Sequence, residues 1–258
     1  MDLLVAYKDD PAGNNMAEFI SQELEKDGDL FTGKKFDLLI IPSPVISADW
    51  LEEKYDYDNY VFLSKHAAES GVLALTCHST GNFDDAKFGG NSKQLAIPFG
   101  TFQKTYLQNL WEKRNNFPNF QITIEATHHG PTNLNKPCIF IEIGTTQKQW
   151  NDVELCNSIA QIIKKTYETS PKQFPTAICL GGTHYSEKFT NQVINGKFAL
   201  GTVVPKHALE FLDESLFQHI IARNTSAKIV LLDWNSIGKN KQKILELLST
   251  TELEVIKI

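Results

Sequence analysis

The run Leu38-Leu-Ile-Ile41 contains no polar residue, and this decides the class of fold. A strand that buries only one face alternates apolar and polar residues, whereas a strand covered by helices on both faces is apolar throughout. The run Ile229-Val-Leu-Leu232, near the other end of the chain, has the same character. We therefore predict that both runs are strands of a sheet with helices packed on both of its faces.

Outward from these two runs, apolar segments rich in β-branched residues alternate with segments of helical spacing. Strands are predicted at Leu3–Tyr7, Phe36–Pro42, Tyr60–Leu63, Val72–Cys77, Gln94–Phe99, Phe120–Glu125, Cys138–Ile143, Ala177–Leu180, Phe198–Val204, Lys228–Trp234 and Leu253–Ile258. Helices are predicted at Asn14–Lys26, Thr146–Thr169, Leu209–Arg223 and Ser236–Ser249, with N-caps at Asn14 and Thr146. This alternation indicates an α/β fold of three layers, in which a mixed, mainly parallel sheet carries helices on both faces. Because no linker, repeat or low-complexity tract interrupts the chain, residues 1–258 are predicted to form a single α/β catalytic domain.

The composition is that of an ordinary soluble globular protein, with 258 residues, 41% of them hydrophobic and 22% charged. The chain has no apolar run of about 18 residues, so no membrane span is expected. Cys77, Cys138, Cys156 and Cys179 lie far apart without a CxxC motif, which favours reduced cysteines and a cytoplasmic protein. The net charge of −6 disfavours a general coat for nucleic acid, but a local basic face remains compatible with it. We expect a monomer or a small homo-oligomer.

The segment Glu125-Ala-Thr-His-His-Gly-Pro-Thr132 concentrates more potential chemistry than any other stretch of the chain. It brings a carboxylate, two imidazoles and two hydroxyls to the end of the strand-like run Phe120–Ile124. Neighbouring residues of a strand point to opposite faces, so a single pocket would receive only one of the two histidines unless the backbone turns. The Gly-Pro pair favours such a turn.

Four other strand-like runs end in similar residues. They lead into Ser64-Lys-His66, His78-Ser-Thr-Gly-Asn82, Glu142-Ile-Gly144 and Gly181-Gly-Thr-His184-Tyr185. If the strands are parallel, their carboxyl ends lie together and these residues line one crevice. Each also has a structural interpretation: a strand cap at His66, a hydrogen-bonded turn at His78–Asn82, or close backbone packing at the glycine pair. Of the remaining histidines, His219 is expected to have only a surface role, and His207 is left open.

A hydrolytic metal site needs two or three neutral histidines, a carboxylate and an open position for water. His78, His128, His129, His184, Glu125 and Glu142 could supply these groups. The alternative without metal is a histidine general base that acts on water or on a hydroxyl such as that of Thr80. The chain has no GxSxG elbow, no Walker A loop and no GxGxxG after its first strand, which argues against P-loop phosphotransferases and dinucleotide oxidoreductases.

Several of these stretches together resemble the archaeal and plant type of D-aminoacyl-tRNA deacylase. The blocks that carry the resemblance are Leu75-Thr-Cys-His-Ser-Thr-Gly-Asn-Phe83, Glu125–Thr132, Phe140-Ile-Glu-Ile-Gly144 with Trp150, Gly181–Tyr185, Ala96-Ile-Pro98, Phe198-Ala-Leu-Gly201 with Pro205-Lys206, and Val230-Leu-Leu-Asp-Trp234. Their order matches across nearly the whole chain. The sequence departs from the family at Lys65, where an Arg is frequent, at Thr183, where a third Gly is usual, and at Asn235-Ser-Ile-Gly238. Lysine keeps the charge of Arg but loses its bidentate phosphate geometry.

The resemblance implies a phosphorylase/hydrolase-like fold and a zinc-associated proofreading hydrolase that cleaves the ester between a D-amino acid and the 3′ end of tRNA. The catalytic residues it suggests are His78, Thr80, Glu125, His128 and His129, and the Zn²⁺ ligands are His78, His128, Glu142 and His184. Residues expected to bind D-aminoacyl-tRNA are His66, Gly81, Asn82, Gly181, Gly182, Tyr185 and Lys206, with Lys87 as a further phosphate contact. Two other functions stay open: a metal-dependent hydrolase of a small amide or ester, and a non-enzymatic tRNA-binding protein.

Overall fold

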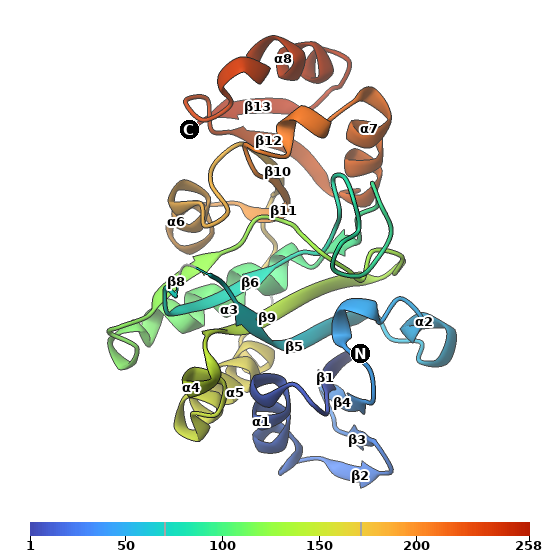
Figure 1. Cartoon of the computed structure of the whole chain (residues 1–258), viewed down its shortest axis with the longest axis vertical. Coiled ribbons are helices and arrows are strands. Elements are labelled where there is room, and N and C mark those ends of the chain that lie inside the picture. The colour runs from blue at the N-terminus through green and yellow to red at the C-terminus, as the bar shows by residue number, and fades with distance from the viewer. Residues whose placement is uncertain (70, 171) are drawn as a thin grey trace.

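The strands of this protein divide between two sheets rather than forming one (Figure 1). A computed structural model describes residues 1–69, 71–170 and 172–258. In these residues the larger sheet has nine strands in the order β2-β3-β4-β1-β5-β9-β6-β8, with β7 beside β9, and the smaller has the order β11-β10-β12-β13. The strands are β1 (Asp2–Tyr7), β2 (Glu25–Asp27), β3 (Leu30–Thr32), β4 (Phe36–Ile41), β5 (Asn59–Ala67), β6 (Ala74–His78), β7 (Ile97–Pro98), β8 (Gln121–Ile124), β9 (Pro137–Thr145), β10 (Thr176–Leu180), β11 (Ala199–Val204), β12 (Ala227–Leu232) and β13 (Glu254–Lys257).

Helices cover both faces of the sheets, so the predicted α/β class is confirmed. They are α1 (Pro11–Ser21), α2 (Leu51–Lys54), α3 (Gly100–Glu112), α4 (Gln147–Trp150), α5 (Val153–Glu168), α6 (Glu187–Asn195), α7 (Glu214–Arg223) and α8 (Lys241–Ser249). Helices α1 and α5 pack together on the larger sheet, and α3 packs against β11 of the smaller one. Short 3-10 helices occur at Val45–Ser47, Arg114–Asn116, Leu209–Phe211 and Gly238–Asn240.

The predicted helix ends are correct in part. Asn14 is not an N-cap but lies inside α1, because Asp10 caps the helix by accepting a hydrogen bond from the backbone N–H of Gly13 (2.9 Å). Thr146 does cap a helix, but the predicted helix Thr146–Thr169 is two helices, and Asp152 caps the second. Helices α3 and α6 and the hairpin of β2 and β3 were not predicted.

Most strand pairs are parallel, as expected, but β6 runs in the direction opposite to the neighbouring β9. Strands β4, β1, β5 and β9 are parallel to one another in that order, and the smaller sheet is parallel throughout its described pairs. The β2–β3 hairpin joins the edge of the larger sheet with β3 antiparallel to β4. Strand β6 is antiparallel to β9, with Thr76 opposite Glu142, and β8 is parallel to β6. The pairing is therefore mixed and mainly parallel, and β6 and β8 bring their carboxyl ends to the site from the opposite direction.

The two faces of the larger sheet follow from the alternation of side chains along a strand. On β5 and β9, the residues Val61, Leu63, Ile139 and Ile141 belong to the core under α1, α3 and α5. The alternate residues, such as Phe62 and Phe140, belong to a separate core with β1, β4 and the segment that contains α2. The polar residues that continue this second face along β5 and β9 form the site described below.

In the described residues, no helix is long and apolar enough to cross a membrane. The four cysteines are buried and free.

Candidate active site

Five histidines and two glutamates gather where β5, β9 and β6 meet the loops that follow β8 and β10. His66 lies on β5, His78 ends β6, and Glu142 lies on β9. Glu125, His128 and His129 follow β8, whereas His184 follows β10 of the smaller sheet. The crevice predicted from the strand ends thus exists, but His66 and Glu142 are inside strands rather than beyond them.

Alternation along the strands explains why His66 and Glu142 meet. His66 shares a face of β5 with Phe62, and Glu142 shares a face of β9 with Phe140, so the apolar core gives way to polar groups along one face. In the antiparallel register His78 lies opposite Phe140, and its ring stacks on that phenyl ring with centroids 5.4 Å apart. The antiparallel β6 therefore delivers a histidine next to Glu142.

A backbone turn at His129 places both adjacent histidines on the same cavity. Strand β8 has already ended at Ile124, and His129 adopts a φ of 44° in the left-handed region. The rings of His128 and His129 have centroids 4.4 Å apart, and both line the cavity. The turn favoured by Gly130-Pro131 thus occurs, and strand alternation does not separate the two histidines.

Distant residues hold this loop in place. Asp49 Oδ1 accepts hydrogen bonds from the backbone N–H groups of Thr132 and Asn133, both at 2.7 Å. The guanidinium of Arg223, at the end of α7, donates to the carbonyls of Leu95 (2.6 Å) and Leu134. The loop between β8 and β9 is therefore fastened from both sides by charged groups.

Three histidines share one arrangement of their ring nitrogens. The Nδ1 atoms of His78, His128 and His129 lie 3.0, 2.8 and 2.7 Å from the main-chain carbonyls of Ser79, Ala126 and Gly130. A carbonyl only accepts, so each Nδ1 carries the proton and each neutral ring keeps a lone pair on Nε2. This is the arrangement in which histidines bind metal ions.

The pKa values of two of these histidines favour the neutral form. Burial and the charges of His78 and His129 hold the pKa of His128 well below its usual range. Burial and the charge of His78 lower the pKa of His129 to about 4. For His78, burial alone would lower the pKa, but the neighbouring carboxylate of Glu142 raises it.

The two glutamates are buried and ionised. Burial and the charge of Glu142 oppose ionisation of Glu125, but the hydrogen bond from His184 and the nearby His128 and His78 lower its pKa to about 2. His184 Nε2 donates to Glu125 Oε2 at 2.8 Å. Burial likewise opposes ionisation of Glu142, but the hydrogen bond from His66 and the nearby His78, whose Nε2 lies 3.6 Å from Glu142 Oε2, hold the pKa of Glu142 below its usual range.

His66 bridges the two carboxylates. Its Nδ1 lies 3.3 Å from Glu142 Oε2 and 3.2 Å from Glu125 Oε1, and its Nε2 is hydrogen-bonded to the hydroxyl of Tyr185. Burial alone would lower the pKa of His66, but the hydrogen bond to Glu142 and the two negative charges raise it. A protonated His66 balances part of the buried negative charge.

These donors include three groups whose ligand atoms lie within 4.8 Å of one another: His78 with His128 and His129, Glu125 with His128 and His184, and His66 with Glu125 and Glu142. The four zinc ligands expected from the sequence are spread over these groups and do not form one of them in the described residues. The residues present can hold a metal ion, and the three-histidine group has the free Nε2 lone pairs. Among the described residues, His78 Nε2 is buried and has no hydrogen-bond partner.

The cluster opens into a cavity of about 890 Å³. Its polar lining residues include His66, His128, His129, Glu142, His184 and Tyr185. Its apolar lining residues include Pro44, Val45, Ile46, Ala67, Val72 and Phe88. His78 and Glu125 are not among the described lining residues, whereas the carboxylates of Glu142 and Asp10 are. Asp10 caps α1 and accepts the N–H of Lys65, so Glu142 is the lining carboxylate that belongs to the histidine cluster.

Other residues singled out in the sequence have structural hydrogen bonds instead. The Thr80 hydroxyl is buried and donates to the Pro131 carbonyl (2.5 Å). The proton of this hydroxyl, which was expected to bind a substrate carbonyl, is therefore already used within the fold. The backbone N–H of Gly81 donates to the His129 carbonyl (2.8 Å). Asn82 donates to the carbonyls of Gly89 and Asn91.

The N–H groups of Gly181 and Gly182 also have hydrogen-bond partners within the protein. The N–H of Gly181 donates to Val204, and the N–H of Gly182 donates to the Ser236 hydroxyl at 2.6 Å. With φ angles of 102° and 78°, both positions favour glycine. Lys206 is exposed beside this turn, and its N–H donates to Gly182. His219 accepts a hydrogen bond from the N–H of Leu95 (3.1 Å), which gives it a structural partner outside the cluster.

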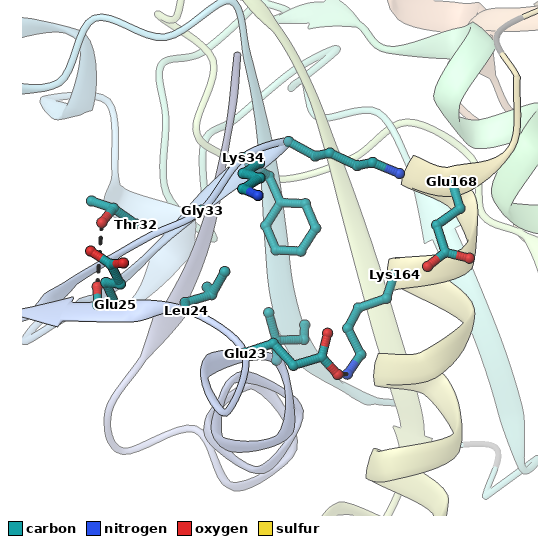
Figure 2. A pocket seen from close by; sticks show the side chains of 11 residues that line it. Glu23, Leu24, Glu25, Thr32, Gly33, Lys34, Lys164 and Glu168 are labelled. Atoms are coloured by element: carbon teal, nitrogen blue, oxygen red, sulfur yellow. Dashed lines mark hydrogen bonds and ion pairs between the residues drawn. The ribbon is translucent and has the colours of Figure 1, made fainter.

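A second hollow of about 500 Å³ lies between the end of α1, the β2–β3 hairpin and α5 (Figure 2). Its charged lining residues are Glu23, Glu25, Lys34, Lys35, Lys164 and Glu168, and Lys164 pairs with Glu23 at 2.7 Å. The lining described there includes neither histidine nor cysteine. We therefore place the chemistry in the larger cavity.

Comparisons with known proteins give one family for nearly the whole chain. A family model described as D-aminoacyl-tRNA deacylase matches residues 53–256. The chain is 55% identical over 256 residues to a D-aminoacyl-tRNA deacylase of Cenarchaeum symbiosum, with 99% of each chain covered. It is 29% identical to one of Archaeoglobus fulgidus over 100% of this chain and 96% of that one. A crystal structure described as a conserved protein of unknown function has a TM-score of 0.93 at 28% identity, covering 100% of this chain and 95% of the other.

Proposed function

This chain belongs to the D-aminoacyl-tRNA deacylase family, and from that premise we propose that it hydrolyses the ester between a D-amino acid and the 3′ end of tRNA. The observation that carries the proposal is the cavity beside the histidine cluster, where neutral imidazoles and an ionised carboxylate face one space. Such a reaction removes D-amino acids from tRNA and so proofreads chirality.

We propose Zn²⁺ as the cofactor, held by His78, His128 and His129. Their Nε2 lone pairs, the orphaned Nε2 of His78 among the described atoms, and the hydrogen bonds at Nδ1 fit a three-histidine site with one position open. The chemistry that zinc supplies when bound is Lewis acidity, which polarises a carbonyl and lowers the pKa of water. This set replaces His184 and Glu142 of the sequence-based set with His129.

The other polar residues then have separate roles. Glu142 lines the cavity as an ionised carboxylate and accepts the proton of the attacking water. His66, which donates to Glu142 and contacts Tyr185, holds that carboxylate in place. His184 donates through Nε2 to Glu125, and in its imidazolium form it carries a second proton on Nδ1, which it passes to the leaving ribose oxygen to become the neutral ring. The exposed Lys206 and Lys87 are proposed to contact phosphates of the tRNA end.

The direct test measures release of D-tyrosine from D-Tyr-tRNA, with L-Tyr-tRNA as the chirality control. His128→Ala and His129→Ala should abolish deacylation and lower the zinc content of the purified protein, with the fold preserved by circular dichroism. His207→Ala is the matched control, because His207 is exposed and lies outside the metal-ligand groups of the described residues. Full deacylation by both site variants would refute the assignment.

The same assay decides between this function and its alternatives. Hydrolysis of D-tyrosine ethyl ester but not of D-Tyr-tRNA would favour a small-ester hydrolase. Binding of tRNA with no hydrolysis by zinc-loaded protein would favour a binding protein.

A further inference from the structure

Phe88 has an exposed aromatic ring at the edge of the catalytic cavity. Its side chain is 68% exposed, the highest value among the large apolar side chains of the described residues. The same cavity is lined by Phe88, His128 and His129. A single exposed phenylalanine is common on protein surfaces, so its place on this cavity and the rigidity of its loop carry the argument.

The loop that contains Phe88 is hydrogen-bonded to the loop between β8 and β9, which carries His128 and His129. The Phe88 carbonyl accepts a hydrogen bond from Gly130, the residue after His129, at 3.1 Å. The amide of Asn82 donates to the carbonyls of Gly89 (2.9 Å) and Asn91 (3.2 Å). The backbone of Phe88 is therefore positioned from both sides.

The two glycines after Phe88 allow the backbone of this loop to pack closely against Ile46 and Thr132. Gly89 and Gly90 have φ angles of 79° and 73°, which favour glycine. A Cβ atom on Gly89 would lie 2.0 Å from the Ile46 carbonyl oxygen, and one on Gly90 would lie 2.6 Å from the Thr132 side chain. The backbone is thus tightly packed while the ring beside it stays open to solvent.

We propose that Phe88 stacks on the base of the terminal nucleotide of the tRNA, an inference that rests on the proposed function. The ester and the terminal base are attached to the same ribose, so a substrate whose ester reaches His128 and His129 must place that base at the rim of their cavity. Proteins recognise unpaired nucleotides by stacking bases on exposed aromatic rings. A ring held ready on a fixed backbone loses little conformational freedom when a base stacks on it.

The competing occupant of this rim is the side chain of the D-amino acid. A ring that contacts the amino acid would affect every D-tyrosyl ester equally, whatever alcohol it carries. A ring that contacts the terminal base affects only esters that carry a nucleoside. The two assignments therefore differ in a ratio of rates measured on one protein.

The test compares D-Tyr-tRNA, the D-tyrosyl ester of adenosine and D-tyrosine ethyl ester as substrates. In Phe88→Ala, kcat/KM for the two nucleoside-containing esters, relative to the ethyl ester, should fall roughly 5- to 150-fold, which corresponds to ~1–3 kcal/mol for one stacked base. The loss should lie mainly in KM. Phe88→Tyr and Phe88→Trp should keep the ratio within about twofold, since both retain an aromatic face. Leu245→Ala, which removes a 41% exposed side chain from α8, is the matched control.

Other outcomes overturn the proposal. An equal loss on all three esters assigns Phe88 to the amino acid, and a loss on D-Tyr-tRNA alone assigns it to a nucleotide further from the ester. An unchanged ratio removes any role in stacking. If the wild-type protein leaves D-Tyr-tRNA intact, the proposed hydrolysis fails separately. Stacking is then tested by filter binding of uncharged tRNA with and without its terminal nucleotide. Phe88→Ala should weaken binding of the intact tRNA only. An equal effect on both tRNAs would contradict stacking on the terminal base.

Discussion

Replacing Asp49 by alanine tests how the loop that carries His128 and His129 is held. Asp49 Oδ1 accepts two backbone N–H groups, those of Thr132 and Asn133, at 2.7 Å each. A hydrogen bond to a charged group stabilises a protein by ~1.5–3 kcal/mol. Because both bonds share one oxygen of a partly exposed side chain, we expect Asp49→Ala to lower the free energy of unfolding by about 2–4 kcal/mol. The released loop should also misplace His129 and reduce kcat/KM for D-Tyr-tRNA.

Urea denaturation gives the change in stability, and deacylation of D-Tyr-tRNA gives the change in activity. Asp49→Asn should lose about 1 kcal/mol, since the amide keeps an acceptor oxygen but not the charge. Glu52→Ala is the matched control, because Glu52 accepts the N–H of Asn135 (2.7 Å) further along the same loop, where both groups are exposed. If Asp49→Ala changed stability by less than about 0.5 kcal/mol, the usual range for neutral surface substitutions, and kept wild-type kcat/KM, the loop would not depend on Asp49.

Two further predictions concern the same loop. Arg223→Ala should destabilise the protein by about 2–4 kcal/mol in thermal or urea unfolding, because the carbonyls of Leu95 and Leu134 lose their hydrogen-bond donor. Arg223→Lys should recover only part of this loss, since an ammonium cannot replace the planar fork of donors of a guanidinium. Equal stability of all three proteins would contradict this role of Arg223. In the metal-free protein, burial and the charge of His78 lower the pKa of His129 to about 4. Between about pH 4 and 6.5 the unfolded chain therefore binds more protons than the folded one. The stability contributed by the neutral His129 is complete above about pH 6.5 and is lost as the pH falls toward 4. The slope of unfolding free energy against pH in that window should be smaller in His129→Asn, and an unchanged slope would argue against a neutral, half-buried His129.

Apolar periodicity predicted the strands better than the helices. The continuous runs around Leu38 and Ile229 became β4 and β12, because a strand covered on both faces leaves no place for polar residues. Helix α3 was missed because its buried face includes Gln103 and the fully buried Lys104, which interrupt the apolar stripe. Lys104 donates to the carbonyls of Val193 and Gly196 at the end of α6. Partners that are distant in the chain satisfy such a group, and local spacing does not reveal them.

The residues of the site were found for a reason that is only half correct. The expectation was that parallel strands bring their carboxyl ends together, and this applies to β5 and β9 but not to β6, which is antiparallel to β9. His78 nevertheless reaches Glu142 because the register of β6 places it opposite Phe140. Residue type identified the participants, whereas strand direction and register, which depend on tertiary pairing, decided how they meet.

The residues that support the site could not be recognised from local sequence patterns. Asp49 and Arg223 act through main-chain groups of the loop that carries His128 and His129, and neither belongs to a motif with recognisable spacing. Phe88 was the exception with a usable signal, since an aromatic residue followed by two glycines marks a ring presented on a tight turn. That signal becomes specific only when the turn is seen against His129 and Gly130.

The role of each clustered histidine depends on the groups that its ring contacts rather than on its position along a strand. Because a main-chain carbonyl fixes the proton on Nδ1 of His78, His128 and His129, these three rings present the same lone pair and suit the same task. His66 and His184 instead direct a ring nitrogen at a carboxylate, which suits them to hold or pass a proton. Strand alternation suggested different tasks for the adjacent His128 and His129. Since β8 ends before them and both Nδ1 atoms donate to main-chain carbonyls, we assign them the same one.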